Sequence, residues 1–235
     1  MPTLYGLYPN PGSTSFKCTE LWIDYDSNAT ITGYRENRLP SLTSIPQGGY
    51  ADAVSTAVSA RSERRLPDIV GFKAVHGLEY DGCHECSPQV MEAMAKAIPL
   101  APLHNPMFIE VIESVRSVLG PGPFTGAHFE TSYGRALPRC ARATGIPTPL
   151  AEKLGLWRRG FHGNSHLYAS ERCARLIGLN ASLADMVLDE DRILPGTGPC
   201  PLLRIESNEE LVVAQACTNL LTRAERYTDT LFLQD

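Results

Sequence analysis

The run Asn-Pro-Gly-Ser-Thr-Ser-Phe-Lys at residues 10–17 decides how this chain of 235 residues begins to fold. Residues 3–8 before it and residues 16–23 after it are rich in aromatic and aliphatic side chains, whereas the run itself is built mostly of turn-forming residues. A second turn at residues 24–28 leads into a third strand-like stretch at residues 29–35. The N-terminal segment is therefore predicted to form a β-meander.

The same run has the composition of a phosphate-binding loop. Gly12 and the hydroxyls of Ser13 and Ser15 allow backbone amides to approach an anion closely, and Lys17 adds a compact positive charge. The Gly-Lys-Ser/Thr sequence of a P-loop is absent, and an Asn-Pro-Gly-Ser turn is also common as a plain hairpin connection. The residues alone leave both interpretations open.

Strands and helices alternate downstream of the meander. Ser87-Pro88 and Asn105-Pro106 each place a capping residue before a proline that can occupy the first position of a helix. The predicted order is a helix over 50–58, a buried strand over 69–75, helices over 88–97 and 105–120, and a strand over 124–129. This order indicates an α/β fold with a mixed sheet and helices on its faces.

A second run, Arg-Gly-Phe-His-Gly-Asn-Ser-His at residues 159–166, places two histidines on a turn before a helix predicted over residues 166–177. On a helix the two histidines would share one side, as a zinc site requires, but Gly163 and Asn164 favour a turn and a cap. A histidine such as His162 beside a helix N-terminus is well placed to stabilise a transferring phosphoryl group. A capped helix with one hydrogen-bonded histidine remains the alternative.

Further polar residues lie at the ends of predicted strands or in loops. Lys73 and Glu130 end buried strands, where α/β folds tend to place functional groups, although structural or solvated roles also fit them. Cys-His-Glu-Cys at residues 83–86 is a single CxxC without a second pair, so we predict a polar loop rather than a metal site. Near the C-terminus, Ser207 or Asn208 is predicted to cap a final helix that begins with acidic residues.

Composition argues against several classes of protein. Lys and Arg number 21 against 26 Asp and Glu, a net charge of −5 without a long run of like charges, so no nucleic-acid or anionic-membrane surface is indicated. No apolar run is long enough to span a membrane, and the N-terminus does not resemble a signal peptide. The seven scattered cysteines form no compact disulfide framework, which favours a reducing, cytoplasmic location.

Five motifs, taken in order, resemble those of the acetokinase family of acetate and propionate kinases. The run at residues 10–17 is similar to the family's strand-turn-strand opening. The other four are Gly-Phe-Lys-Ala-Val-His-Gly at 71–77, Pro-Leu-His-Asn-Pro at 102–106, Phe-Glu-Thr-Ser-Tyr at 129–133 and the histidine-rich run at 159–166. Residues 205–215 also resemble the family's C-terminal end.

The resemblance implies the duplicated actin-like ATPase, or ribonuclease H-like, fold. Its first domain would comprise residues 1–149 and 205–235, with the C-terminal helix returning to pack on it, and residues 150–204 would be a truncated remnant of the second, nucleotide-binding domain. It also implies reversible phosphoryl transfer between ATP and acetate or propionate, giving ADP and an acyl phosphate such as acetyl phosphate, with Mg²⁺ as cofactor. A homodimer is compatible with the resemblance.

Carried over motif by motif, the resemblance implies a role for each of nine residues. Glu130 and His162 would be catalytic, Lys73 and His104 would contact the substrate, Lys17, Ser13 and Ser15 would contact the nucleotide, and Asn10 and Glu209 would hold magnesium. Such a division suits phosphoryl transfer, which needs positioning and charge neutralisation more than covalent help.

The sequence departs from the family pattern in three places. Lys73 replaces an arginine and loses its bidentate fork, and Glu130 replaces an aspartate, which displaces the carboxylate by about 1 Å. The family's His-Leu-Gly-Asn-Gly phosphate loop and Gly-Thr-Arg segment do not occur between residues 179 and 205. We therefore weigh a phosphotransferase against an impaired remnant that binds a carboxylate or an acyl phosphate, and against the product of an internally deleted or wrongly delimited gene.

Overall fold

The computed structural model describes residues 2–12, 15–45, 49–136, 142–154, 156–157, 159–176, 192–194, 202–204 and 208–232. Ser13, one of the residues expected to contact a nucleotide, lies outside these ranges, as does most of the segment 179–204. None of the helices in the described ranges combines the length and the apolar character that crossing a membrane requires.

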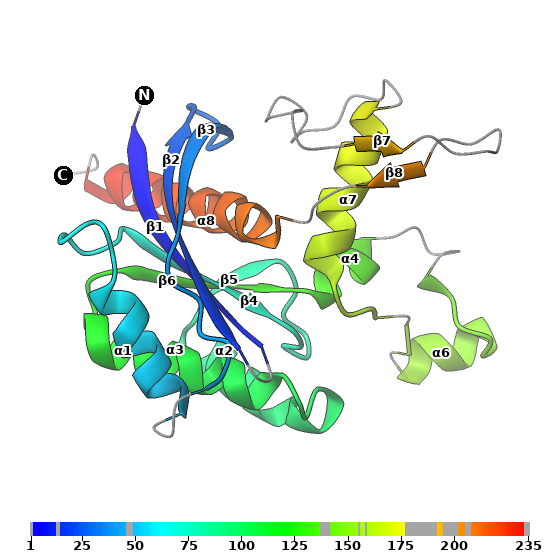
Figure 1. Ribbon diagram of the computed structural model, residues 1–235. Helices are drawn as coiled ribbons and strands as arrows, with labels where there is room; N and C mark the ends of the chain where they lie inside the picture. The colour runs from blue at the N-terminus through cyan, green and yellow to red at the C-terminus, as the bar shows by residue number, and fades with distance from the viewer. Residues whose placement is uncertain are drawn as a thin grey trace.

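A six-stranded mixed sheet forms the centre of the molecule (Figure 1). Its strands are β1 (Thr3–Pro11), β2 (Phe16–Tyr25), β3 (Ile31–Arg38), β4 (Ile69–Ala74), β5 (Cys83–Glu85) and β6 (Phe124–Phe129), in the order β3-β2-β1-β4-β6-β5. The first three strands are the predicted meander, and β1 runs three residues further than predicted because Pro11 still pairs with Phe16. Strands β1, β4 and β6 are mutually parallel, so their carboxyl ends meet at one edge of the sheet.

Helices cover both faces of the sheet (Figure 1). On one face, α1 (Gly49–Ser59), α2 (Pro88–Lys96) and α3 (Asn105–Leu119) enclose a core that includes Phe72 and Phe129. The predicted cap of α2 is present, since the Ser87 side chain accepts a hydrogen bond from the amide of Val90 at 3.4 Å. The mixed α/β arrangement expected from the alternating pattern is thus confirmed.

The opposite face is covered by α8 (Glu209–Phe232), which the side chain of Asn208 caps by accepting a hydrogen bond from the amide of Leu211 at 3.0 Å. The predicted C-terminal helix and its cap are therefore confirmed. Gly71 on β4 permits the close approach of this helix, because a Cβ there would lie 2.9 Å from Cγ1 of Val213. The first turn of the docked helix, which contains two acidic residues, therefore lies at the carboxyl end of the sheet.

The CxxC segment corrects one prediction. Residues Cys83–Glu85 are not a polar loop but the edge strand β5, antiparallel to β6, with Cys83 opposite His128 and Glu85 opposite Gly126. The prediction was wrong because a three-residue edge strand is specified by the neighbouring strand that pairs with it, and so short a segment carries no apolar alternation of its own.

The remaining elements lie beyond the carboxyl edge of the sheet or within its connections. They are the 3₁₀ turn η1 (Ile98–Leu100), α4 (Thr131–Ala136), α6 (Thr148–Leu154), α7 (Gly163–Leu176) and the two-stranded pair β7 (Arg192–Leu194) and β8 (Leu202–Arg204). Helix α7 begins three residues before the predicted start, within the histidine-rich run itself. It packs against both α4 and α8.

Candidate functional site

The site begins at the ends of the parallel strands β4 and β6. Along β4, Phe72 and Ala74 point into the core under α1 and α3, so the alternation of a strand turns Lys73 to the other face. Glu130 follows β6 directly, and its amide donates a hydrogen bond to the carbonyl of Ala74 at 2.8 Å. Two adjacent strand ends thereby place an ammonium and a carboxylate at the same edge.

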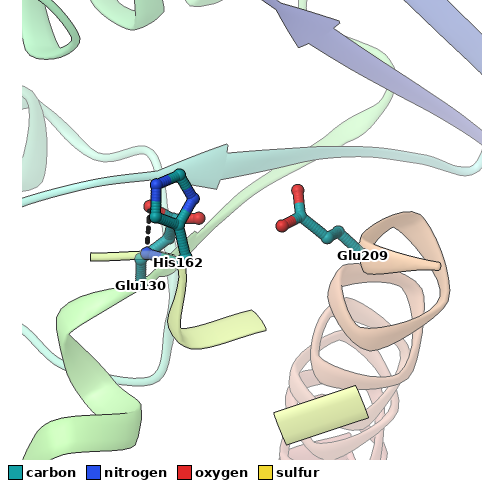
Figure 2. Close-up of side chains that lie close together, drawn as sticks. All are labelled: Glu130, His162 and Glu209. Carbon is teal, nitrogen blue, oxygen red and sulfur yellow. Dashed lines mark hydrogen bonds between the residues drawn. The ribbon is translucent and has the colours of Figure 1, made fainter. Parts of the chain in front are cut away.

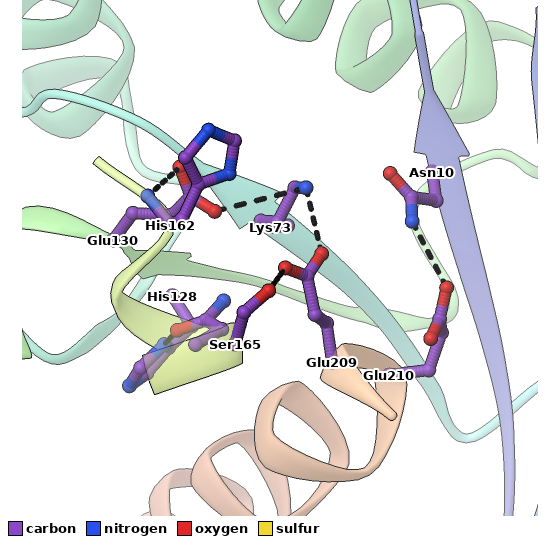
Figure 3. A network of polar contacts seen from close by, with 9 residues as sticks. Asn10, Lys73, His128, Glu130, His162, Ser165, Glu209 and Glu210 are labelled. Carbon is purple, nitrogen blue, oxygen red and sulfur yellow. Dashed lines mark hydrogen bonds and ion pairs between the residues drawn. The ribbon is translucent and has the colours of Figure 1, made fainter. Parts of the chain in front are cut away.

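Lys73 joins this edge to the first turn of α8 (Figure 3). Its Nζ lies 2.7 Å from Oε2 of Glu209 and 3.7 Å from Oε1 of Glu130. The side chains of Lys73, Glu130 and Glu209 are 17%, 3% and 14% exposed, so these charged groups are largely buried away from water. The charge-assisted hydrogen bond between Lys73 and Glu209, which are 136 residues apart in sequence, therefore fixes α8 relative to the sheet.

The start of α7 is the third part of the site, after the ends of β4 and β6 and the first turn of α8. The amide of His162 donates to Oε2 of Glu130 at 3.1 Å, and the carbonyl of His162 accepts from the amide of His166 at 3.0 Å. His162 adopts the left-handed conformation, with φ of 62°, as the chain turns into the helix. The hydroxyl of Ser165 donates to Oε1 of Glu209, which links α7 to α8.

Burial and charge act in opposite directions on the two central groups. Burial alone would lower the pKa of Lys73, but the hydrogen bond to Glu209 and the charges of Glu209, Glu130 and Glu210 outweigh it and raise that pKa. Burial alone would raise the pKa of Glu209, but hydrogen bonds from Lys73 and Ser165 outweigh it and lower that pKa. Both groups are therefore charged at neutral pH.

We expect Ser165→Ala to raise the pKa of Glu209 toward its ordinary value, because one hydrogen bond to the charged carboxylate is lost. A lowered carboxyl pKa stabilises the fold above the unfolded-state pKa, and this effect is lost as the pH falls through the folded-state pKa. The variant should therefore lose less stability than the wild type as the pH falls from 7 through the lowered pKa of Glu209. The loss at pH 7 should be about 1–2 kcal/mol in urea denaturation.

Ser114→Ala is the matched control for this variant, because Ser114 donates to a backbone carbonyl on the exposed side of α3. An unchanged pH dependence in Ser165→Ala would contradict the Ser165–Glu209 contact.

Glu130, His162 and Glu209 are also close enough to share one small ligand (Figure 2). Each offers one ligand atom, and these atoms lie within 4.8 Å of one another. Oε1 of Glu130 is buried without a hydrogen-bond donor and has the ammonium of Lys73 as its charged neighbour. Carboxylate oxygens of this kind suit Mg²⁺, and the added imidazole would also suit a transition metal.

Two adjoining cavities open at this edge. The first cavity, of about 340 Å³, lies between the sheet and the start of α3. Its charged and polar lining includes Lys73, His104, Glu130 and His162, and its apolar lining includes Val75, Leu103, Met107, Phe108 and Phe161. Leu103 is 77% exposed and forms part of the rim.

The second cavity, of about 410 Å³, is lined by more polar and charged groups. They are Asn10, Lys17, Thr19, Arg38, Ser41, Ser165, Glu209 and Glu210. Asn10 and Lys17 line both cavities and mark their boundary.

The structure therefore gathers eight of the nine residues singled out in the sequence, all except Ser13, around these two cavities. Asn10 donates from Nδ2 to Glu210 at 3.0 Å, and Asn10 and Glu209 share the second cavity. Ser15 closes the turn, as the amide of Gly12 donates to its carbonyl at 2.8 Å. The roles carried over to these residues stay predictions.

Sequence reasoning missed two members of the network. Ser165 lies in the histidine-rich run and Glu210 at the acidic start of the final helix, but the sequence predicts no contact for either residue. The position of Ser165, one helical turn after His162, could have indicated that both residues lie on the same side of the α7 N-terminus. The hydrogen bond between Asn10 and Glu210 spans 200 residues and gives no local signal.

Sequence comparison identifies relatives that match more than half of this chain. The profile of the Acetokinase family matches residues 43–188. The chain is 41% identical to the acetate kinase of Microcystis aeruginosa over 145 residues, which are 60% of this chain and 36% of the relative. It is 31% identical to the acetate kinase of Deinococcus deserti over 196 residues, which are 76% of this chain and 48% of the relative.

Solved structures give the same result for the fold. The crystal structure of Porphyromonas gingivalis acetate kinase superposes with a TM-score of 0.56 at 25% identity, and that of a propionate kinase from Francisella tularensis with 0.53 at 22% identity. Each match covers 75% of this chain and 50% of the other. The chain thus spans about a third to a half of the relatives it matches. Both solved kinases have the actin-like ATPase fold, of which this chain corresponds to about half, and the chain belongs to the acetokinase family.

Proposed function

We propose that the first cavity binds a short-chain carboxylate, acetate or propionate, or the corresponding acyl phosphate. The observation that carries this proposal is the pairing, in one cavity of about 340 Å³, of an ammonium and two imidazoles with a compact apolar wall. The ammonium of Lys73 and the imidazole N–H groups of His104 and His162 suit the carboxylate or phosphate end. Val75 and Met107 suit a short alkyl end.

The chain's own residues would divide the work as follows. Lys73 neutralises negative charge on the bound anion, while its ion pairs with Glu130 and Glu209 hold its ammonium at the cavity wall. Glu130 positions His162 by accepting the hydrogen bond from its amide, so the imidazole projects beside the same cavity. Phe161 and Leu103 narrow the entrance and limit the length of the alkyl chain.

Phosphoryl transfer with MgATP is the second candidate function, and the grouping of Glu130, His162 and Glu209 favours it. The donor set fits Mg²⁺, since Glu130 offers a buried oxygen without a hydrogen-bond donor and Glu209 and Asn10 line the second cavity. Magnesium, when bound, would offset charge on the phosphates. A carboxylate oxygen would form the new O–P bond to the γ-phosphorus as the bond to ADP breaks, with His162 and Lys73 stabilising the charge.

We also propose the domain division implied by the resemblance, with residues 1–149 and 205–235 in the first domain and residues 150–204 in a shortened second one. The packing of α8 on the sheet supports the first part of this division. The start of α7, which completes the site, would then come from the second domain.

Thermal unfolding with added ligand tests the binding proposal. Acetate, propionate or acetyl phosphate at about 100 times its Kd should stabilise the wild type by about 2.7 kcal/mol, a rise of roughly 5–10 °C in Tm. Lys73→Met should abolish the shift, whereas Lys96→Met, at an exposed lysine on α2, should retain it. Absence of a shift with all three ligands in the wild type would refute the proposal.

Trapping of the product with hydroxylamine tests the transfer reaction separately. Purified protein incubated with acetate, MgATP and hydroxylamine should give acetyl hydroxamate if the chain is a kinase, and Glu130→Ala should give none. Stabilisation by acetyl phosphate without hydroxamate formation would support the binding function alone. The two functions therefore fail independently.

A further inference from the structure

Two thiols from distant parts of the chain meet on the face of the sheet covered by α8. Sγ of Cys83 on β5 and Sγ of Cys217 on α8 lie 3.6 Å apart, although 134 residues separate them in sequence. Cys18, Cys83, Cys86 and Cys217 are all free thiols in the described ranges. Neither member of the pair belongs to the network around Lys73.

Gly126 on β6 provides the space that both sulfur atoms occupy. A Cβ at Gly126 would lie 2.8 Å from Sγ of Cys217 and 3.4 Å from Sγ of Cys83. An S–S bond is about 2.05 Å long, so the sulfur atoms must approach by about a further 1.5 Å to form one. The packing thus places the two sulfur atoms in van der Waals contact, and a glycine at position 126 leaves room for both.

The two cysteines differ in access to solvent. Cys83 is partly exposed at the sheet edge, whereas Cys217 and Cys86 are fully buried. The hydrogen bond with Cys83, followed by burial, raises the pKa of Cys217. An oxidant in solution would therefore meet Cys83 first, and Cys217 would be the thiol positioned to react with the oxidised sulfur.

We propose that Cys83 and Cys217 form a reversible disulfide when the protein meets a peroxide. Cys83 gives up its proton and its sulfur attacks hydrogen peroxide, forming a sulfenic acid and a hydroxide that takes up that proton as the first water. The Cys217 thiol then attacks the sulfenic sulfur, and its proton leaves with the hydroxyl group as the second water. In sum, two thiols are oxidised to one disulfide, and one hydrogen peroxide is reduced to two waters. A small thiol reverses the reaction by exchange.

The cross-link would fix α8 on the sheet, two turns of helix beyond the end that contacts Lys73 and Ser165. Cys217 lies eight residues after Glu209, about 12 Å along the helix axis. The disulfide would therefore hold the helix whose first turn contacts Lys73 and Ser165. This inference rests on the thiol geometry and not on the proposed function.

Peptide mapping after peroxide treatment of the folded protein tests the cross-link. Trypsin releases Cys83 within residues 74–96 and Cys217 within residues 205–223, and after alkylation of free thiols the two peptides should appear joined. The first peptide also contains Cys86, so Cys86→Ser should keep the link and Cys83→Ser should remove it. The oxidised protein should unfold at a Tm roughly 5–10 °C higher, a gain reversed by dithiothreitol.

Three results would overturn the inference. They are a Cys83 that stays alkylatable after treatment, a Cys83 oxidised only to sulfinic or sulfonic acid, and a link that persists in Cys83→Ser. Circular dichroism of each variant before oxidation shows whether it is folded. If Cys83→Ser does not fold, mapping of the Cys86→Ser variant decides the question alone.

Discussion

Gly163→Ala is expected to destabilise the protein by on the order of 3 kcal/mol and to abolish ligand binding at the first cavity. Gly163 opens α7 directly against the end of β6, where a Cβ would overlap the carbonyl oxygen of Glu130. The same Cβ would lie 2.9 Å from the carbonyl carbon of Glu130 and 2.9 Å from Cβ of Tyr133. These atoms belong to the backbone or its first side-chain carbon, so no side-chain rotation relieves the overlap.

The loss should come from a displaced α7 rather than from a weaker helix. Alanine favours helix more than glycine does, so helix propensity alone would stabilise the variant by up to about 1 kcal/mol. Displacement would separate the amide of His162 from Glu130 and the hydroxyl of Ser165 from Glu209. Urea denaturation gives the stability change, and ligand-induced thermal shifts give the loss of binding.

Gly160→Ala provides the matched control, because a Cβ built at Gly160 meets no heavy atom of the described residues within 4 Å apart from its chain neighbours. The control should retain wild-type stability and binding. Equal behaviour of the two variants would mean that α7 does not approach Glu130 as closely as described.

The contrast between Gly163 and Ser87 shows what a sequence can predict here. The cap formed by Ser87 depends on residues within one helical turn, so composition and spacing were enough to predict α2 and its start. Position 163 requires a glycine because of the carbonyl group of Glu130, 33 residues earlier, and this contact exists only once β6 and α7 have met. The sequence therefore indicated a turn at Gly163 without the contact that requires it.

The same distinction applies to the site. Lys73 and Glu130 could be predicted because each ends a recognisable buried strand, and parallel strand ends converge. Their link to Glu209 could not be predicted from spacing, since it depends on how α8 docks across Gly71. The resemblance to a family supplied Glu209 as a site residue, and the structure adds the ion pair that Glu209 makes.

Lys73→Met is the second variant with a large expected effect, a loss of about 3–5 kcal/mol at pH 7. Removing the ammonium leaves the carboxylates of Glu130 and Glu209 facing one another, 3% and 14% exposed, without their shared cation. Breaking one side of a buried ion pair costs more than the pair contributes, because the remaining charges stay desolvated. Binding of acetyl phosphate should be lost as well.

The pH dependence distinguishes this effect from lost packing. In the wild type, the lowered pKa of Glu209 stabilises the fold above the unfolded-state value of about 4.3, and this contribution disappears as the pH falls through the lowered pKa. Without Lys73, burial and the neighbouring carboxylate should raise the pKa of Glu209 above its ordinary value. The destabilisation of Lys73→Met by the charged Glu209 is then complete above the raised pKa and disappears below the unfolded-state pKa.

Urea denaturation of wild type and Lys73→Met at pH 7 and pH 4 should therefore show a large stability difference at pH 7 and a much smaller one at pH 4. Lys73→Arg keeps the charge and should recover most of the loss at pH 7, whereas Lys96→Met, which removes an exposed lysine paired with Glu92, should resemble the wild type at both pH values. An equal loss at both pH values would assign the effect to packing of the lysine chain and would remove the ion pair as the feature that holds α8 at the sheet edge.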